Sequence, residues 1–185
     1  MKYRLLFILL SMTFTNVFGQ LNPDKDSKNN LIITADGNCT IDTFAILTNK
    51  NLLPLIKELE SKELLIYQTI KSIPPFINDF LKCSQGGEFT IANPGEKWQV
   101  GDVIIEDLPR RQLIFFGLSD SIALMTYYTG GIGKSEHILI FKIENKIITD
   151  FWCGDVLADL LDKAKVIKYL KKNKDKESLL KSINF

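Results

Sequence analysis

The chain has 185 residues, 45% of them hydrophobic, and a formal net charge of +1 at pH 7. This apolar content excludes disorder for all but the ends, and one domain of ordinary size accounts for the length. The near-neutral charge excludes nucleic acid as a partner, because binding to phosphates needs a clear positive excess.

The first 19 residues have the pattern of a secretory signal peptide. Lys2 and Arg4 precede an apolar run over residues 5–14, and Val17–Gly19 supplies a signal-peptidase site before Gln20. The run is shorter than the roughly 20 residues that a membrane-spanning helix needs. Cleavage leaves 166 of the 185 residues, with 21 basic and 22 acidic side chains. We therefore expect an exported protein, periplasmic or secreted, with no stable membrane insertion after cleavage.

The mature chain is predicted to contain a single globular α+β domain over residues 31–173. Residues 20–30 form an N-terminal segment that we expect to be disordered, and residues 174–185 form a flexible C-terminal tail. Within the domain, N-terminal helices precede an antiparallel meander sheet of four to six strands and a C-terminal helix. We expect the helices to cover one face of the sheet.

Three helices are predicted in the first half of the domain. The first begins near residues 38–40, where short polar side chains can cap free backbone N–H groups. A second helix or helix pair has Pro54 in its first turn and ends near Ile73, before two prolines. A short helix over residues 75–83 follows and is stopped by Gly86 and the glycine after it.

Beyond these glycines the hydrophobic period changes from helical to alternating. Two short strands are predicted at 88–92 and 98–105, and four stronger ones at 112–118, 122–129, 136–143 and 146–152. The connections between the last four are short, which favours antiparallel neighbours. The C-terminal helix is predicted to begin at Gly154-Asp155, with acidic residues early and lysines late, as the helix dipole favours.

Three cysteines, Cys39, Cys83 and Cys153, make an odd number. In an exported protein this predicts one disulfide between two of them and one remaining thiol, with three possible pairings. Cys153 is predicted at a strand-to-helix junction, where a helix N-terminus favours the thiolate.

The loop at residues 130–135, Gly-Gly-Ile-Gly-Lys-Ser, ends like a phosphate-binding loop. Tyr128 occupies the place of the first glycine of that motif, and the loop leads into a strand rather than a helix, so a hairpin connection is the better interpretation. Amphipathic aromatics beside such a loop suit a contact surface. The residues of this predicted surface are Tyr127, Tyr128, Gly130, Gly131 and Lys134. The leading functional prediction is a non-catalytic binding or interaction module for a protein or small-molecule partner.

The alternative prediction is an enzyme. Papain-like thiol hydrolases place a cysteine at a helix start, a histidine on a later strand and an Asp or Asn on a neighbouring strand. The chain resembles that order at Cys39, His137 and Asp150, which implies a nucleophile, a base and an orienting group. No cofactor and no metal are expected, because one histidine and scattered acids do not give ligand spacing.

The turn between the last two predicted strands decides the partner of His137. A two-residue turn at Glu144-Asn145 places His137 opposite Trp152, with Asp150 diagonal on the same face. A three-residue turn shifts the register by one and places His137 opposite Cys153.

Overall fold

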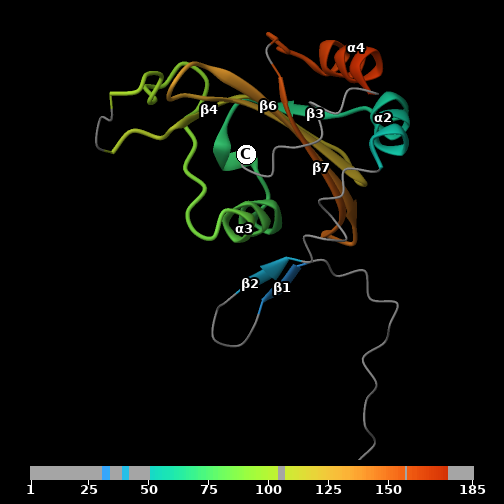
Figure 1. Ribbon diagram of the computed structural model, residues 1–185. Helices are drawn as coiled ribbons and strands as arrows, with labels where there is room; N and C mark the ends of the chain where they lie inside the picture. The colour runs from blue at the N-terminus through green and yellow to red at the C-terminus, as the bar shows by residue number, and fades with distance from the viewer. Residues whose placement is uncertain (1–30, 34–38, 42–50, 104–106, 157, 175–185) are drawn as a thin grey trace, which may run out of the picture.

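A five-stranded antiparallel sheet forms the centre of the fold (Figure 1). The computed structural model describes the backbone of residues 31–33 and 39–41, and residues 51–103, 107–156 and 158–174 in full. The strands pair in chain order as β3 (Leu65–Tyr67), β4 (Arg111–Leu118), β5 (Ile122–Thr129), β6 (Ser135–Glu144) and β7 (Ile147–Val156). This order confirms the α+β class and the predicted meander.

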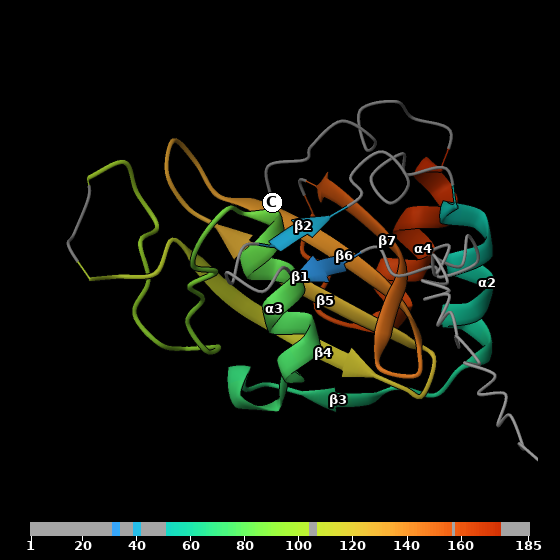
Figure 2. The same ribbon diagram turned by 90° about the horizontal axis from the view of Figure 1, so that it is seen from below.

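Helices lie on both faces of this sheet (Figures 1 and 2). They are α2 (Leu52–Ser61), the short 3₁₀ helix η1 (Ile70–Ser72), α3 (Pro75–Ser84) and α4 (Lys163–Asn173). Phe80 of α3 packs on one face, with its ring centroid 5.0 Å from that of Phe151. Leu59 of α2 and Leu170 of α4 pack on the other face with Trp152. The expectation that the helices cover one face is therefore wrong.

The burial of the central strands explains the second helical layer. Residues 122–127 of β5 are all buried, so side chains on both faces of the strand need cover. A sheet whose two faces are both apolar packs between two layers of other elements.

The first predicted helix is replaced at its start by a β-hairpin. β1 (Leu31–Ile33) pairs antiparallel with β2 (Cys39–Ile41), and β2 lies against α3. Thr40 and Ile41 are β-branched, which favours extended backbone over helix. The rest of that predicted helix lies outside the described residues.

The second predicted helix begins as expected but is shorter. Pro54 lies in the first turn of α2, which ends at Ser61, and Lys62 is extended. Leu65 belongs to β3, because the chain there pairs with Leu118 of β4. A long-range partner overrides the local helical pattern here. The helix predicted at residues 75–83 is confirmed as α3, and Gly86 follows it with a φ of +66°.

The two short strands predicted between α3 and β4 do not form among the described residues there. Ala92 makes an isolated parallel bridge to Gln112. The backbone N–H of Gln99 donates a hydrogen bond to the Pro109 carbonyl oxygen over 2.8 Å. The four stronger strands are confirmed within a few residues of their predicted bounds as β4 to β7.

The last strand is longer and the last helix later than predicted. β7 continues to Val156, and α4 begins at Lys163 with Asp162 as its N-cap. The Asp162 side chain accepts from the Lys165 N–H over 2.8 Å. Cys153 therefore lies inside a strand, where it is buried, and the helix-terminus argument for its reactivity does not apply.

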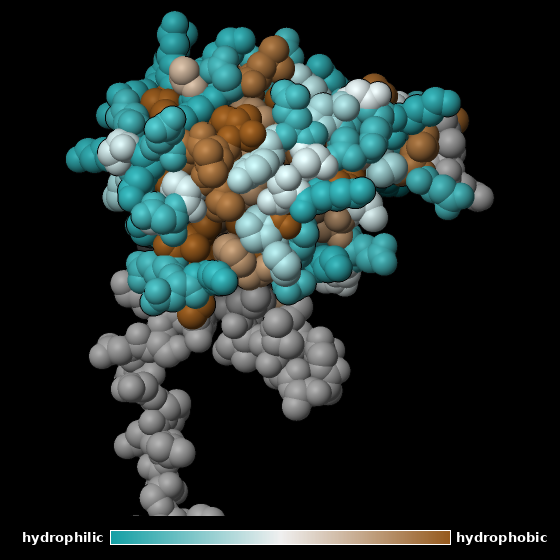
Figure 3. Space-filling view, turned by 180° about the vertical axis from the view of Figure 1, so that it is seen from behind, coloured by the Kyte–Doolittle hydropathy of each residue, from teal (hydrophilic) through white to brown (hydrophobic). Residues whose placement is uncertain are grey.

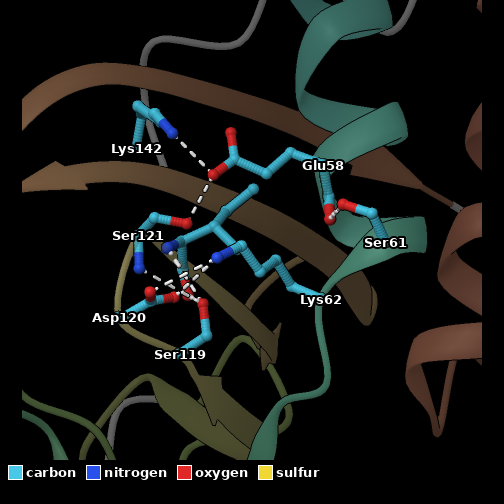
Figure 4. A network of polar contacts seen from close by, with 8 residues as sticks. Glu58, Ser61, Lys62, Ser119, Asp120, Ser121 and Lys142 are labelled. Atoms are coloured by element: carbon cyan, nitrogen blue, oxygen red, sulfur yellow. Dashed lines mark hydrogen bonds and ion pairs between the residues drawn. The ribbon is translucent and has the colours of Figure 1, made fainter.

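A polar network ties α2 to the sheet (Figure 4). Glu58 Oε1 accepts hydrogen bonds from Ser121 Oγ over 2.6 Å and from Lys142 Nζ over 2.5 Å. Lys62 Nζ lies 3.0 Å from Asp120 Oδ1 in the β4–β5 turn. These contacts fix the end of α2, and with it the segment that leads into β3.

Candidate functional site

The β6–β7 hairpin sets the partner of the single histidine. Its turn residues are Asn145 and Lys146, with φ of +53° and +63°, the backbone that a two-residue hairpin turn needs. An irregularity between Lys142 and Ile143 then shifts the register, so that His137 lies opposite Asp155. This register differs from both predicted alternatives.

A chain of side-chain contacts joins Ser135, His137 and Asp155. His137 Nδ1 lies 2.6 Å from Asp155 Oδ1, and His137 Nε2 lies 3.2 Å from Ser135 Oγ. The imidazole stacks on Tyr127 with centroids 4.9 Å apart and an angle of 6°. His137 is 4% exposed, whereas the Asp155 side chain is 40% exposed. The order serine, histidine, aspartate with these distances is that of a nucleophile, a base and an orienting group.

Asp150 does not take part in this chain. It lies opposite Lys142, and its Oδ2 accepts a hydrogen bond from Asn51 Nδ2 over 2.6 Å. Lys142 contacts Glu58 of α2, so the paired Asp150 lies on the α2 face of the sheet, opposite to the face of His137. The carboxylate beside His137 is therefore that of Asp155, not that of Asp150 as predicted.

The cysteines lie on different elements. Cys39 is in β2 and not at a helix start, so its predicted match to the nucleophile position of papain-like hydrolases does not hold. Cys153 is buried in β7 opposite Leu139 and takes no part in a disulfide.

Tyr127 is a core residue rather than part of an exposed surface. Its side chain is fully buried, and Phe89 packs edge-on against it at 5.8 Å. Burial raises the pKa of the phenol far above its ordinary value, and the Arg111 guanidinium opposes that rise. The prediction that Tyr127 contributes to a contact surface is therefore wrong.

Tyr128 and Lys134, two other residues of that predicted surface, form a cluster whose members pair with one another. Lys134 Nζ lies 4.1 Å from the centroid of the Tyr128 ring and 3.7 Å from Asp159 Oδ1. The Tyr128 hydroxyl donates to the same Asp159 oxygen over 3.4 Å, and Trp98 stacks with Tyr128 at 6.2 Å. The polar tips of Tyr128 and Lys134 thus both contact the Asp159 carboxylate.

Gly130 has a packing role beside this cluster. A Cβ at this position would lie 1.8 Å from the backbone oxygen of Gln99, closer than any side chain allows. Gly131, the next residue, has a φ of +139°, which favours glycine. Both glycines of the predicted surface are therefore explained by the backbone path.

Glu136 is buried on the opposite face from His137. Both of its carboxylate oxygens accept from the Leu160 N–H, over 3.2 and 3.1 Å. Burial, followed by the charge of Asp159, raises its pKa to about 7, although the Leu160 hydrogen bond and Lys134 act against the rise. Glu136 thereby anchors the segment that leads into α4 and borders a cavity of about 250 Å³.

A larger groove, of about 1100 Å³, lies between α4 and the β3 edge of the sheet. Leu64, Ile66 and Phe115 contribute apolar surface from the sheet side, and Ile167 and Leu161 contribute it from the α4 side. Its charged lining residues are Glu60, Glu63, Asp162, Lys163, Lys168, Lys171 and Lys172. Figure 3, seen from behind relative to Figure 1, shows a strip of apolar surface framed by hydrophilic side chains. β3 lies on this rear side of the molecule (Figure 2).

The groove combines segments that are distant in the sequence, and for this reason sequence analysis does not find it. Its residues come from the end of α2, from β3, from Phe115 and from residues 161–172. The available signal is the run Leu64-Leu65-Ile66-Tyr67, whose β-branched and aromatic members suit a strand.

Comparison with known proteins gives no family model that matches the chain, no similar curated protein and no similar solved structure. Within the described part of the chain, no cluster of histidine, cysteine and acidic side chains is arranged to hold a metal ion. No helix described by the structure has both the length and the apolarity to cross a bilayer.

Proposed function

We propose that the protein is an exported, non-catalytic binding module that holds its partner in the groove between α4 and β3. The groove itself carries this proposal. An open, mainly apolar depression with charged residues along its walls is the usual form of a binding site. The polar groups of the Tyr128 cluster, by contrast, already pair with one another, which leaves that surface less to offer a partner.

The proposal of export is based on the signal-peptide pattern of the first 19 residues. A disulfide would support it. We infer a disulfide between Cys39 and Cys83, because disulfides persist in oxidising compartments. Cys153 is buried in β7 and takes no part in a disulfide, so we expect it to be the remaining thiol. β2, which contains Cys39, lies against α3, which contains Cys83.

The bridge is tested by mass spectrometry of the mature protein without reduction. A peptide linking Cys39 to Cys83, with Cys153 alkylated after denaturation, is expected. Three alkylated cysteines in the exported protein would contradict the inference. The same analysis reads the N-terminus, where Gln20 is expected as the first residue.

Binding at the groove is tested with an apolar anionic dye, anilinonaphthalene sulfonate. The wild-type protein is expected to bind it saturably with a rise in fluorescence. Ile66→Lys, which places a charge on the groove floor, should abolish the saturable component. Ile132→Lys is the matched control, because Ile132 is fully exposed in the β5–β6 loop. Absence of saturable binding, or equal binding by Ile66→Lys, would contradict the proposal.

A second candidate function is acyl transfer by a hydrolase, and the contacts of His137 favour it. The distances from Ser135 Oγ to Nε2 and from Nδ1 to Asp155 are within reach of a catalytic triad. In this hypothesis the nucleophile is Ser135 instead of the predicted Cys39, and the orienting group is Asp155 instead of the predicted Asp150.

This candidate is tested with a fluorophosphonate probe, which labels activated serines. Labelling of the wild type that is lost in Ser135→Ala, but kept in the exposed-site control Ser61→Ala, would support a hydrolase. Labelling of Cys39 by iodoacetamide that depends on His137 would instead support the thiol hydrolase. Failure of both probes would leave the binding module as the function.

A further inference from the structure

We propose that the partner held in the groove is an extended peptide that pairs with the free edge of β3 as a sixth strand and directs acidic side chains toward α4. This inference rests on the proposed binding function. It names the chemistry of the partner: an acidic strand with apolar residues at alternate positions.

β3 lies at the edge of the sheet. Among the described strands β3 pairs only with β4, through Leu65 to Leu118, Ile66 to Gly117 and Tyr67 to Phe116. Its other edge is therefore open within the described part of the molecule. An edge strand presents backbone N–H and C=O groups to which a peptide can add by main-chain hydrogen bonds.

β3 exposes apolar side chains on both faces. Ile66 lines the groove and is 50% exposed, and Leu65, which points to the opposite face, is 67% exposed. Tyr67, on the same face as Leu65, stacks on Phe116 of the α3-side core. A helix or a small apolar molecule lying in the groove covers only the Ile66 side. A sixth strand has side chains on both faces, so it covers Leu65 and Ile66 together.

The α4 wall of the groove carries positive charge. Lys171 pairs with Glu60, and Lys163 donates to the Lys62 carbonyl oxygen. Lys168 and Lys172 also line the groove, and neither forms an ion pair with another described residue. Glu60 and Glu63 lie on the opposite wall and Asp162 caps the start of α4, whereas all the lining lysines belong to α4 itself. Carboxylates on the partner fit this wall, and charges of this kind govern partner choice and association rate.

The experiment uses the mature protein and a synthetic peptide of alternating glutamate and valine, Glu-Val-Glu-Val-Glu-Val-Glu. A second peptide has the same sequence with N-methyl groups on alternate amides along one edge, which removes strand pairing but keeps charge and apolarity. A third replaces each glutamate with lysine. Binding is followed by calorimetry and by hydrogen exchange of the β3 amides.

We expect the glutamate peptide to bind, to displace the dye and to slow exchange of the β3 amides. N-methylation and the change to lysine are each expected to weaken binding by about tenfold or more. Lys168→Glu combined with Lys172→Glu should weaken it similarly. Lys82→Glu combined with Lys97→Glu, which changes net charge equally at exposed positions that do not line the groove, should have an effect of less than about twofold.

Three results would overturn this inference. Equal binding of the N-methylated peptide would exclude strand pairing, and dye binding without binding of any peptide would leave the proposed function standing with a different partner. Failure of the dye itself to bind contradicts the proposed function, so the two failures are distinguishable. Self-association of the protein that Leu65→Lys abolishes would identify a second copy of the chain as the occupant and would also overturn the inference.

Discussion

The end of the sheet beside the β5–β6 loop and the groove beside β3 differ in what their side chains contact. Near the loop, His137 contacts Asp155 and Ser135, and Lys134 contacts Asp159 and Tyr128. Beside β3, apolar side chains are half exposed and two lysines line the groove without an ion pair to a described residue. A region rich in reactive residue types can therefore be internally satisfied, whereas a region with ordinary residue types can be open to a partner.

The largest expected effect tests how tightly the loop end is packed. Gly130→Ala should lower the free energy of unfolding by about 3 kcal/mol, because the new Cβ meets the Gln99 carbonyl oxygen. Gly87→Ala is the matched control, since its Cβ would meet no atom within 4 Å. Urea denaturation measures both variants. Equal stability of the two variants would show that the backbone beside the β5–β6 loop can shift to accommodate a Cβ. That result would contradict the tight packing proposed for this end of the sheet.

The next effect distinguishes the two aspartates. Asp155→Ala should cost about 2 kcal/mol of unfolding free energy, because it leaves buried His137 without its carboxylate contact. Asp150→Ala, which removes a hydrogen bond with exposed Asn51, should cost about 0.5 kcal/mol. Denaturant midpoints of the two variants check this order. The reverse order would contradict the observed register of β6 and β7.

A smaller effect concerns the buried carboxyl group at the start of β6. The pKa of Glu136 is raised from 4.5 to about 7 in the folded protein, so its contribution to stability is present below about pH 4.5 and is lost as the pH rises through 7. Glu136→Gln keeps an oxygen acceptor for the Leu160 N–H and does not ionise. Compared with the wild type, this variant should gain on the order of 1 kcal/mol between pH 5 and pH 8 after allowance for solvent screening. Thermal denaturation over that range measures the gain, and parallel curves for both proteins would contradict it.

Local patterns in the sequence predicted much of the fold and less of the site. The strands β4 to β7 follow from alternation of apolar residues, and α3 follows from Pro75 and Gly86. β3 was not predicted, because its short run continues the helical pattern of α2 and the pairing with β4, about fifty residues later, decides for the strand. The end of β7 was not predictable either, since the glycine and acid at 154–155 suit a helix start as well as a strand.

The site illustrates the same limit at the level of single residues. The sequence identifies His137 as the one histidine, but its partner depends on an irregularity between Lys142 and Ile143 that shifts the register of the hairpin. With that shift Asp155 replaces Asp150. The groove depends on packing among four segments, so its existence is a property of the tertiary structure alone.

The most direct test of the account is to map where a ligand binds on the isotope-labelled mature protein by NMR. During titration with the alternating glutamate–valine peptide, chemical-shift changes should cluster in residues 64–68 of the β3 edge and 161–172 around α4. Residues 128–135 at the β5–β6 loop should change little. Shifts concentrated at 128–135, with β3 and α4 unaffected, would contradict the claim that the groove is the binding surface.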